Sequence, residues 1–186
     1  MILGERIRLR PIEKDDLPRY VKWFSDPDLR GHLDGHLPLS QVQEEKWFEQ
    51  MLANKERNTQ PWAIDAQPAD MAVGPWVHIG GCSLHEIEWR HRWAELGIVI
   101  GARDYWGRGY GTDVVRTLTG WAFDMLNLNR VYLRVFADNA RAIRCYEKVG
   151  YQLEGRLRQH SFNNGAYRDV LLMGVLRSDW NRPART

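Results

Sequence analysis

The chain has 186 residues, of which 44% are hydrophobic and 27% charged, and its formal net charge is +2 at pH 7. This composition is typical of a folded globular chain and excludes a disordered one, so we expect a single domain over residues 1–186. So small a charge, with arginines scattered among acids, gives no reason to expect a nucleic-acid partner.

Two further features predict the cellular setting. The chain starts directly with a polar alternating segment and has no apolar run of membrane-spanning length, so we expect no signal peptide and no membrane partner. Two cysteines, Cys82 and Cys145, are too few for a disulfide framework and fit a reducing compartment. A cytoplasmic protein is therefore predicted.

The first half of the chain mixes short strands with helices. Glu5–Arg10 alternates polar and apolar residues and predicts a strand, followed by a helix from about Asp15 to about Phe24. Ser40 and Gln43 form a capping-box pattern ahead of a second helix. The other elements predicted here are a turn at Ser25–Asp28, a loop at 30–38, strands at Pro61–Asp65, Trp76–Leu84 and Trp93–Ile100, a turn at 66–75 and a polar hairpin at Glu86–Arg92.

The most informative segment is Asp104–Arg116, where Gly107, Gly109 and Gly111 stand at alternate positions before a helical pattern. Glycine permits backbone paths closed to other residues, and a helix start offers free N–H groups and a positive dipole end to a phosphate. The loop is therefore a candidate pyrophosphate cradle, with a tight packing turn as the alternative. It lacks the Gly-Lys-Ser/Thr of a P-loop and the spacing of a dinucleotide fingerprint.

The second half continues with a strand at Arg130–Phe136 and a short helix at Asn139–Val149, which Gly150 closes as a left-handed cap. Two final strands, around Tyr151–Phe162 and Tyr167–Leu176, meet at the hairpin signal Asn163–Gly165. Strands and helices thus share the whole chain, which predicts one mixed α/β domain.

Two of these segments resemble the GNAT superfamily of acyl-CoA N-acetyltransferases. Trp106–Gly111 is similar to the family's cofactor loop [QR]-x-x-G-x-[GA], with Trp106 where Gln or Arg is usual. Similar Trp-Gly-x-Gly-Tyr loops occur in the branch of ribosomal-protein N-terminal, spermidine and aminosugar acetyltransferases. The family's second pattern, Asn-x-x-Ala-x-x-x-Tyr-x-Lys-x-Gly-Phe/Tyr, is matched by Asn139, Ala142, Tyr146, Lys148, Gly150 and Tyr151.

The resemblance implies a fold and a co-substrate. The fold would be α/β (α+β): a single domain with a mixed, mostly antiparallel twisted sheet of about six to seven strands, about four flanking helices and a splayed central strand pair. The co-substrate would be acetyl-CoA, with backbone N–H groups from Gly107 to Thr112 on its pyrophosphate. The implied coenzyme contacts are the strand residues Val99, Ile100 and Gly101, the loop residues Gly107, Arg108, Gly109, Tyr110, Gly111 and Thr112, and Asn139.

Two of these contacts have an ordinary structural alternative. Arg108 fits a solvated surface arginine as well as a phosphate ligand. Asn139 is a possible helix N-cap, although Asp138 is a second capping candidate that would leave Asn139 free for coenzyme A.

The resemblance also implies an acid and a base. Tyr146 matches the family's general acid for the departing thiolate; its alternative is a half-buried core aromatic. A primary amine of pKa about 10.4 costs about 4.6 kcal/mol to deprotonate at pH 7, so a base acting through water is useful. Glu95 is the candidate base, and a salt-bridge partner is its alternative. Weaker candidates are Asp65, His78 and His85.

Direct transfer in a ternary complex is expected, because Cys145, beside Tyr146, is more readily a buried hydrophobe than an acyl carrier. The histidines show no metal-ligand spacing with acids or cysteines, so no metal is predicted. They are His32, His36, His78, His85, His91 and His160.

The acceptor remains open among a peptide N-terminus, a polyamine, an aminosugar and an aminoglycoside, in a monomer or homodimer. Its expected site includes Trp23, Phe24, His32, Asp34, His36 and the 158–165 turn. Two rival functions are a non-catalytic acyl-CoA-binding regulator or sensor and a nucleotide-binding module or kinase. The second lacks the lysine and metal-binding acids of phosphoryl transfer.

Overall fold

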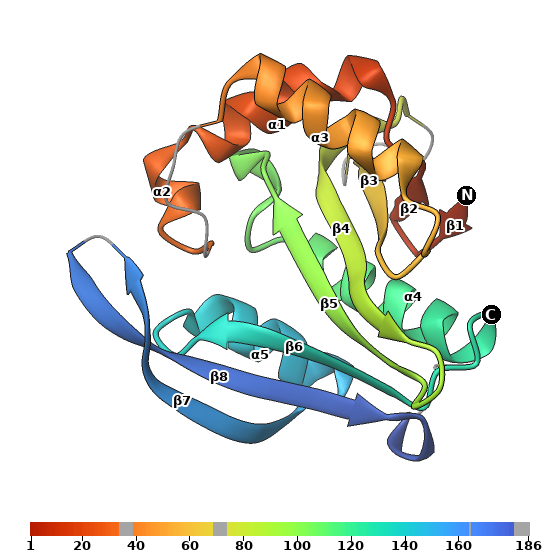
Figure 1. Cartoon of the computed structure of the whole chain (residues 1–186), viewed down its shortest axis with the longest axis vertical. Helices are drawn as coiled ribbons and strands as arrows, with labels where there is room; N and C mark the ends of the chain where they lie inside the picture. Colours follow the sequence, from red (N-terminus) through yellow and green to blue (C-terminus); the bar gives the residue numbers. More distant parts are fainter. Residues whose placement is uncertain (34–38, 69–73, 164, 181–186) are drawn as a thin grey trace.

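The structure, a computed structural model, describes residues 1–33, 39–68, 74–163 and 165–180. One sheet runs through it in the order β1-β2-β3-β4-β5-β6-β8-β7, with antiparallel neighbours throughout except for the parallel pair β5–β6 (Figure 1). The strands are β1 Ile2–Leu3, β2 Ile7–Arg10, β3 Gln60–Ala66, β4 Val77–Glu88, β5 Trp93–Ile100, β6 Arg130–Phe136, β7 Gln152–Asn163 and β8 Ala166–Leu176.

This is a single α/β domain with a mixed, mostly antiparallel sheet, as predicted. It has eight strands, one more than expected, because β1 is only two residues long and too short to show alternation. The helices are α1 Leu17–Phe24, α2 Pro27–Arg30, α3 Gln41–Ala53, α4 Tyr110–Asp124 and α5 Ala140–Val149, with 3-10 turns η1 Lys14–Asp16, η2 Arg103–Tyr105 and η3 Arg177–Asp179.

Local capping explains where two helices begin. The capping box predicted at Ser40 and Gln43 is confirmed, since each side chain accepts a hydrogen bond from the other residue's backbone N–H. The turn predicted at Ser25–Asp28 is wrong in part. Asp26 instead caps the short helix α2 by accepting from Asp28 N at 3.0 Å, and Pro27 occupies its first position, where a missing N–H costs nothing.

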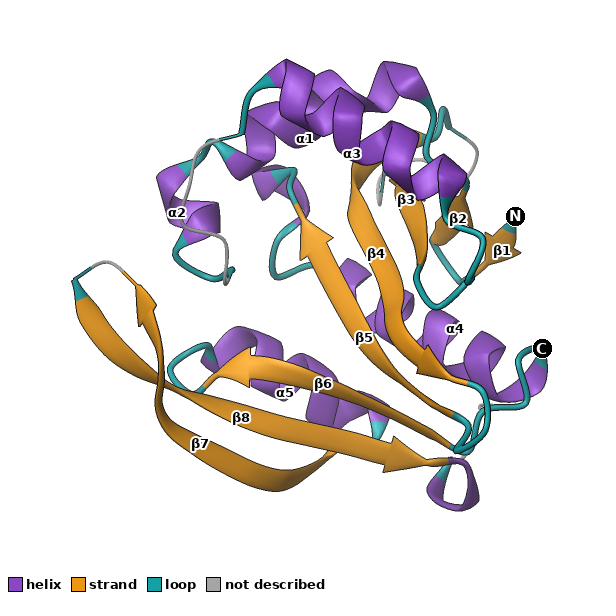
Figure 2. Cartoon of the chain, viewed as in Figure 1, coloured by secondary structure: helices purple, strands orange, loops and turns teal. Residues whose placement is uncertain are grey.

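The helices cover the two faces of the sheet differently. On one face, Val114 and Leu118 of α4 share a buried cluster with Ile7 of β2 and Val131 of β6. On the other face, Tyr20 of α1 belongs to a separate small cluster over β3. Figure 2 shows α1 and α3 lying across the β2–β5 part of the sheet, with α4 behind β5 and α5 behind β6. Among the described helices, none covers the opposite face of β6.

The predicted splay between the central strands is present. β5 pairs with β6 only at Trp93–Arg130, Ala94–Val131 and Glu95–Tyr132. Beyond Glu95, β5 stays with β4 as far as Ile100, while β6 stays with β8. Figure 1 shows the two strands diverging from this junction. The backbone edges that face each other beyond the junction are therefore unpaired in the sheet.

Candidate active site

The glycine loop has the geometry of an anion cradle. Gly107 and Gly109 have φ values of +72° and +87°, which favour glycine over any residue with a side chain. Gly109 is the N-cap of α4 and supplies no side-chain cap. The first N–H groups of this 15-residue helix thus point out of its N-terminus without a capping oxygen, as a phosphate site requires.

Four contacts hold the loop in place. Arg6 Nη2 donates to the carbonyl oxygen of Arg108 at 2.8 Å, and its guanidinium lies 4.5 Å from the Tyr110 ring centroid. Trp106 Nε1 donates to the carbonyl oxygen of Ile100 at 2.6 Å. The guanidinium of Arg141, at the start of α5, lies 4.2 Å from the Trp106 ring centroid. The loop is therefore tied to the residue before β2, to β5 and to α5.

The loop side chains divide into buried and exposed ones. Tyr110 is 1% exposed and its hydroxyl donates to the carbonyl oxygen of Gln67 at 2.8 Å, so only its backbone faces the loop. The Arg108 side chain is exposed and does not line the neighbouring cavity, which matches its surface alternative.

Two of the three strand residues predicted to contact pantetheine already use a backbone group in a hydrogen bond within the protein. Gly101 N donates to the carbonyl oxygen of Ile79 at 2.8 Å, and a Cβ on Gly101 would lie 2.1 Å from the Trp23 ring. The carbonyl oxygen of Ile100 already accepts from Trp106. Val99 and Ile100 line the cavity, and Gly101 does not.

A cavity of about 1130 Å³ passes between the splayed strands. Glu95 of β5 faces the α1 side of the sheet, because its neighbours Ala94 and Leu96 pack into the cluster on the α4 side. Tyr146 of α5 belongs to that opposite cluster, yet both residues line the same cavity. Among the predicted site residues, those that line it are Glu95, Val99, Ile100, Gly107, Gly109, Gly111, Thr112, Asn139 and Tyr146.

Tyr146 has the properties of a proton donor. It is 8% exposed, and its hydroxyl makes no hydrogen bond to another described residue. Burial, together with nearby Cys145, raises the pKa of Tyr146, so the phenol is protonated at neutral pH. Burial likewise raises the pKa of the Cys145 thiol, which accepts from Thr112 Oγ1 at 3.4 Å. Cys145 is therefore not a ready thiolate nucleophile.

Glu95 is both a cavity residue and an ion-pair partner. Its Oε1 accepts from Arg134 Nε at 2.8 Å and its Oε2 accepts from Arg134 Nη2 at 3.1 Å. The salt-bridge alternative is thus observed, and it fixes the carboxylate at the point where β5 and β6 part. His85 of β4 lies directly opposite Glu95 in the strand register.

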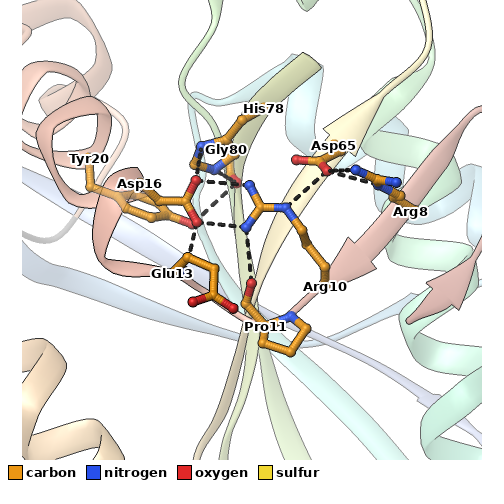
Figure 3. Close-up of polar contacts among 9 residues, drawn as sticks. All are labelled: Arg8, Arg10, Pro11, Glu13, Asp16, Tyr20, Asp65, His78 and Gly80. Atoms are coloured by element: carbon orange, nitrogen blue, oxygen red, sulfur yellow. Dashed lines mark hydrogen bonds and ion pairs between the residues drawn. The ribbon is translucent and has the colours of Figure 1, made fainter. Parts of the chain in front are cut away.

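The weaker base candidates separate clearly. Asp65 and His78 do not line the cavity; Figure 3 shows them in a network of polar contacts with Arg10 and Asp16. Arg10 Nε lies 2.9 Å from Asp65 Oδ2, and His78 Nδ1 lies 3.1 Å from Asp16 Oδ1. This network joins β2, β3 and β4 to the start of α1, which is a structural role.

His85, by contrast, does line the cavity. Its Nε2 lies 2.7 Å from Ser83 Oγ, and burial lowers the pKa of the imidazole, which is therefore neutral at pH 7. A Cβ on Gly97 would lie 2.7 Å from the same nitrogen, so the glycine makes room for the ring. Of the three weaker candidates, His85 is thus the one that the structure brings to the cavity, directly opposite Glu95.

Of the two capping candidates at the start of α5, the structure has Asn139 and not Asp138. Asn139 itself is the N-cap, its Oδ1 accepting from Ala142 N at 3.2 Å. Asp138 instead forms an ion pair with Arg168 of β8. Asn139 still lines the cavity, with its side-chain amide nitrogen left for a ligand.

The expected acceptor side is reached by Phe24, His32 and His160, all of which line the cavity. Trp23 instead packs on Gly101 and on His78, with ring centroids 5.0 Å apart. Asp34, His36 and position 164 of the 158–165 turn lie outside the described residues.

Glu44 of α3 is a cavity residue that the sequence did not single out. It lies four residues before Phe48 and so shares a helical face with it, and this spacing was the pattern that could have placed Glu44 on the buried side of α3.

Within the described ranges, the structure contains no cluster of three or more His, Cys, Asp or Glu side chains able to hold a metal ion. No described helix is long and apolar enough to cross a membrane.

Comparison with known proteins agrees with this geometry. The family model "Acetyltransferase (GNAT) domain" matches residues 6–152. The chain is 29% identical to spermidine N(1)-acetyltransferase of Escherichia coli, covering 94% of this chain and 88% of the relative. It is 33% identical to a putative ribosomal N-acetyltransferase of Bacillus subtilis over 54% of this chain and 55% of the relative.

A solved structure, the spermidine N-acetyltransferase of Vibrio cholerae in complex with CoA and spermine, superposes with a TM-score of 0.84 at 26% identity, covering 95% of this chain and 98% of the other. A dodecameric structure of that enzyme superposes with a TM-score of 0.76 at 27% identity, covering 94% and 96%. The cradle, the splay and the match over residues 6–152 lead to one conclusion: this chain belongs to the GNAT family of acetyl-CoA-dependent N-acetyltransferases.

Proposed function

We propose that the chain, as one domain over residues 1–186, transfers the acetyl group of acetyl-CoA directly to a primary amine within a ternary complex. The observation that carries this is the single cavity that joins Glu95 on one face of the sheet to Tyr146 on the other, through the gap between β5 and β6. Donor and acceptor can then meet from opposite sides at one point, which supplies the effective molarity of a bound pair.

The donor's contacts follow from the loop. Backbone N–H groups from Gly107 to Thr112 would hold the pyrophosphate at the start of α4. Val99, which lines the cavity, would lie beside pantetheine where β5 parts from β6, and the Asn139 amide nitrogen would donate to the pantetheine chain. Ile100 and Gly101 would contribute less, because the Ile100 carbonyl oxygen already accepts from the Trp106 indole and the Gly101 N–H already donates to Ile79.

The transfer needs one proton removed and one supplied. The neutral amine attacks the thioester carbonyl carbon, a C–N bond forms and the C–S bond breaks. Glu95, through a water molecule, takes the proton that the amine loses, and the Tyr146 hydroxyl protonates the departing thiolate. The ion pair with Arg134 holds the Glu95 carboxylate at the cavity wall, where a water molecule could bridge it to the amine.

The acceptor is an amine on a small molecule or peptide, and the names of the Escherichia and Vibrio relatives favour a polyamine. The Vibrio dodecamer makes a homo-oligomer larger than the expected monomer or homodimer a specific alternative, which light scattering would distinguish. Both cysteines are free, consistent with a reducing, cytoplasmic setting.

The test is release of free thiol from acetyl-CoA across a panel of peptide, polyamine, aminosugar and aminoglycoside acceptors. We expect amine-dependent release together with an acetylated product of matching mass. Binding of acetyl-CoA without release on any amine would contradict the proposal and favour an acyl-CoA sensor.

A further inference from the structure

Glu44 of α3 is a buried carboxylate with no partner. It is 5% exposed and lines the cavity, yet within the described part of the chain its side chain makes no hydrogen bond or ion pair. Among the other buried carboxylates, Asp16, Asp65 and Glu95 each have an arginine, and Asp113 accepts from the backbone N–H groups of Glu5 and Arg6. The Glu44 carboxylate therefore opens onto the cavity with no protein partner among the described residues, and this wall presents an acidic group to a bound ligand.

The surroundings of Glu44 suit a cation. Trp47, three residues further on, shares its helical face and also lines the cavity. Tyr20 of α1 lies close enough for the Glu44 charge to act on its hydroxyl, and Phe24 stacks on Tyr20 with ring centroids 6.0 Å apart. Aromatic faces beside a carboxylate attract ammonium groups.

The charges along the cavity are arranged from basic to acidic. Arg141, Arg144 and Lys148 line it on α5, beside the glycine loop, where coenzyme phosphates would bind. Arg134, further along, is neutralised by Glu95. No described basic residue is paired with Glu44, so a cationic group of the acceptor is favoured at this wall.

We propose that Glu44 binds a second cationic group of the acceptor, so that the substrate is a diamine or longer polyamine. This rests on the proposed function. One amino group loses its proton and is acetylated near Glu95 and Tyr146, while the other stays charged against Glu44 and the ring of Trp47. Burial raises the pKa of the Glu44 carboxyl, and a bound ammonium would restore its ionised form.

The experiment compares α,ω-diamines of increasing length with monoamines of the same length in the thiol-release assay. At one or more lengths, the wild type should show a higher kcat/KM for the diamine. Glu44→Gln should raise the diamine KM by at least about tenfold with little change in kcat, and leave the monoamine constants unchanged. Glu44→Asp, which keeps the charge, should retain part of the preference.

The matched control is Glu45→Gln. Glu45 accepts from Gln41 Nε2 at 3.0 Å and does not line the cavity, so its loss should leave the diamine preference intact. Acetyl-CoA affinity by calorimetry should be the same in all variants.

Each outcome has a distinct meaning. Transfer with equal preference in the wild type, or an unchanged preference in Glu44→Gln, overturns the role of Glu44 alone. Absence of transfer to every amine overturns the proposed function itself.

Discussion

The indole Nε1 of Trp106 donates a 2.6 Å hydrogen bond to the carbonyl oxygen of Ile100, the last residue of β5. The guanidinium of Arg141, on α5, stacks over the same indole, 4.2 Å from the ring centroid. Trp106 occupies the first position of the cofactor loop, where much of the family has Gln or Arg. In this chain the Trp106 side chain contacts both β5 and α5, so it holds the glycine loop in place from outside the coenzyme site.

Trp106→Phe should loosen this link. The variant loses one part-buried hydrogen bond but keeps an aromatic ring for Arg141, so we expect a loss of about 1 kcal/mol in unfolding free energy and weaker acetyl-CoA binding. Denaturant unfolding and calorimetry measure the two effects. Trp89→Phe, at an exposed position, should change neither. Normal acetyl-CoA affinity in Trp106→Phe would show that the link does not shape the cradle.

Gly109→Ala should weaken acetyl-CoA binding about tenfold. Its φ of +87° strains any L side chain, and the new Cβ would lie 3.0 Å from Arg6 Nη2. Gly165→Ala is the matched control, because that glycine has a φ of +80° with nothing within 4 Å of the added Cβ. Both variants should lose about 1 kcal/mol of stability, but only Gly109→Ala should bind the donor poorly. Equal donor affinity in the two would remove the loop from the coenzyme site.

Tyr146→Phe should lower kcat by roughly 10 to 100-fold and leave acetyl-CoA affinity nearly unchanged, because only the proton donor is lost. Tyr151 lies 6.1 Å away between ring centroids, and its hydroxyl is 2.8 Å from Thr119 Oγ1. Tyr151→Phe should therefore reduce stability by about 1 kcal/mol and spare turnover. Steady-state kinetics on both variants measures these effects on kcat. A Tyr146→Phe enzyme with wild-type kcat would rule out the role of Tyr146 as the acid.

Glu95→Gln should lower kcat by roughly 100-fold if Glu95 takes the amine's proton. The substitution also breaks the ion pair with Arg134, so a control must lose a comparable pair outside the cavity. Glu154→Gln does this, since Glu154 pairs with Arg130 and does not line the cavity. The control should retain activity. If Glu95→Gln also stays active, His85, the neutral imidazole opposite Glu95, becomes the next residue to test.

Stability should fall as the solution is acidified from about pH 7 towards pH 5. Burial lowers the pKa of His78 and of His85, so the unfolded chain, with an ordinary histidine pKa near 6.5, binds more protons in this range than the folded one. His78→Gln retains a donor towards the carbonyl oxygen of Gly80 and should make the slope of unfolding free energy against pH shallower. Denaturant titrations at several pH values measure it, and an unchanged slope would contradict the assignment.

Local signals predicted much of the fold. The Ser40–Gln43 box, the left-handed Gly150 cap and the hairpin between β7 and β8 all depend on residues near one another in sequence. The two-residue strand β1 and the short helix α2 were missed because neither is long enough to show a period.

The site was predictable only in outline. The loop and the α5 pattern lie on continuous segments, so their residues could be named in advance. The ion pair of Glu95 with Arg134 joins two strands that are neighbours only in the folded sheet, and no sequence spacing encodes it. Asn139 caps its own helix because Asp138 is held by Arg168 from β8, which is again a long-range contact.

The short contact between β5 and β6 also has a mechanical consequence. Only three residue pairs join β5 to β6, so the backbone contact across the middle of the sheet is short. Packing of α4 against both strands is the second contact that holds the two halves of the sheet together. A donor bound between the splayed ends of β5 and β6 would stabilise this part of the sheet as well as supply the acetyl group, because it would add hydrogen bonds where the β5–β6 pairing ends. Amide exchange along the splayed ends of β5 and β6 should then slow when acetyl-CoA binds, before any acceptor arrives.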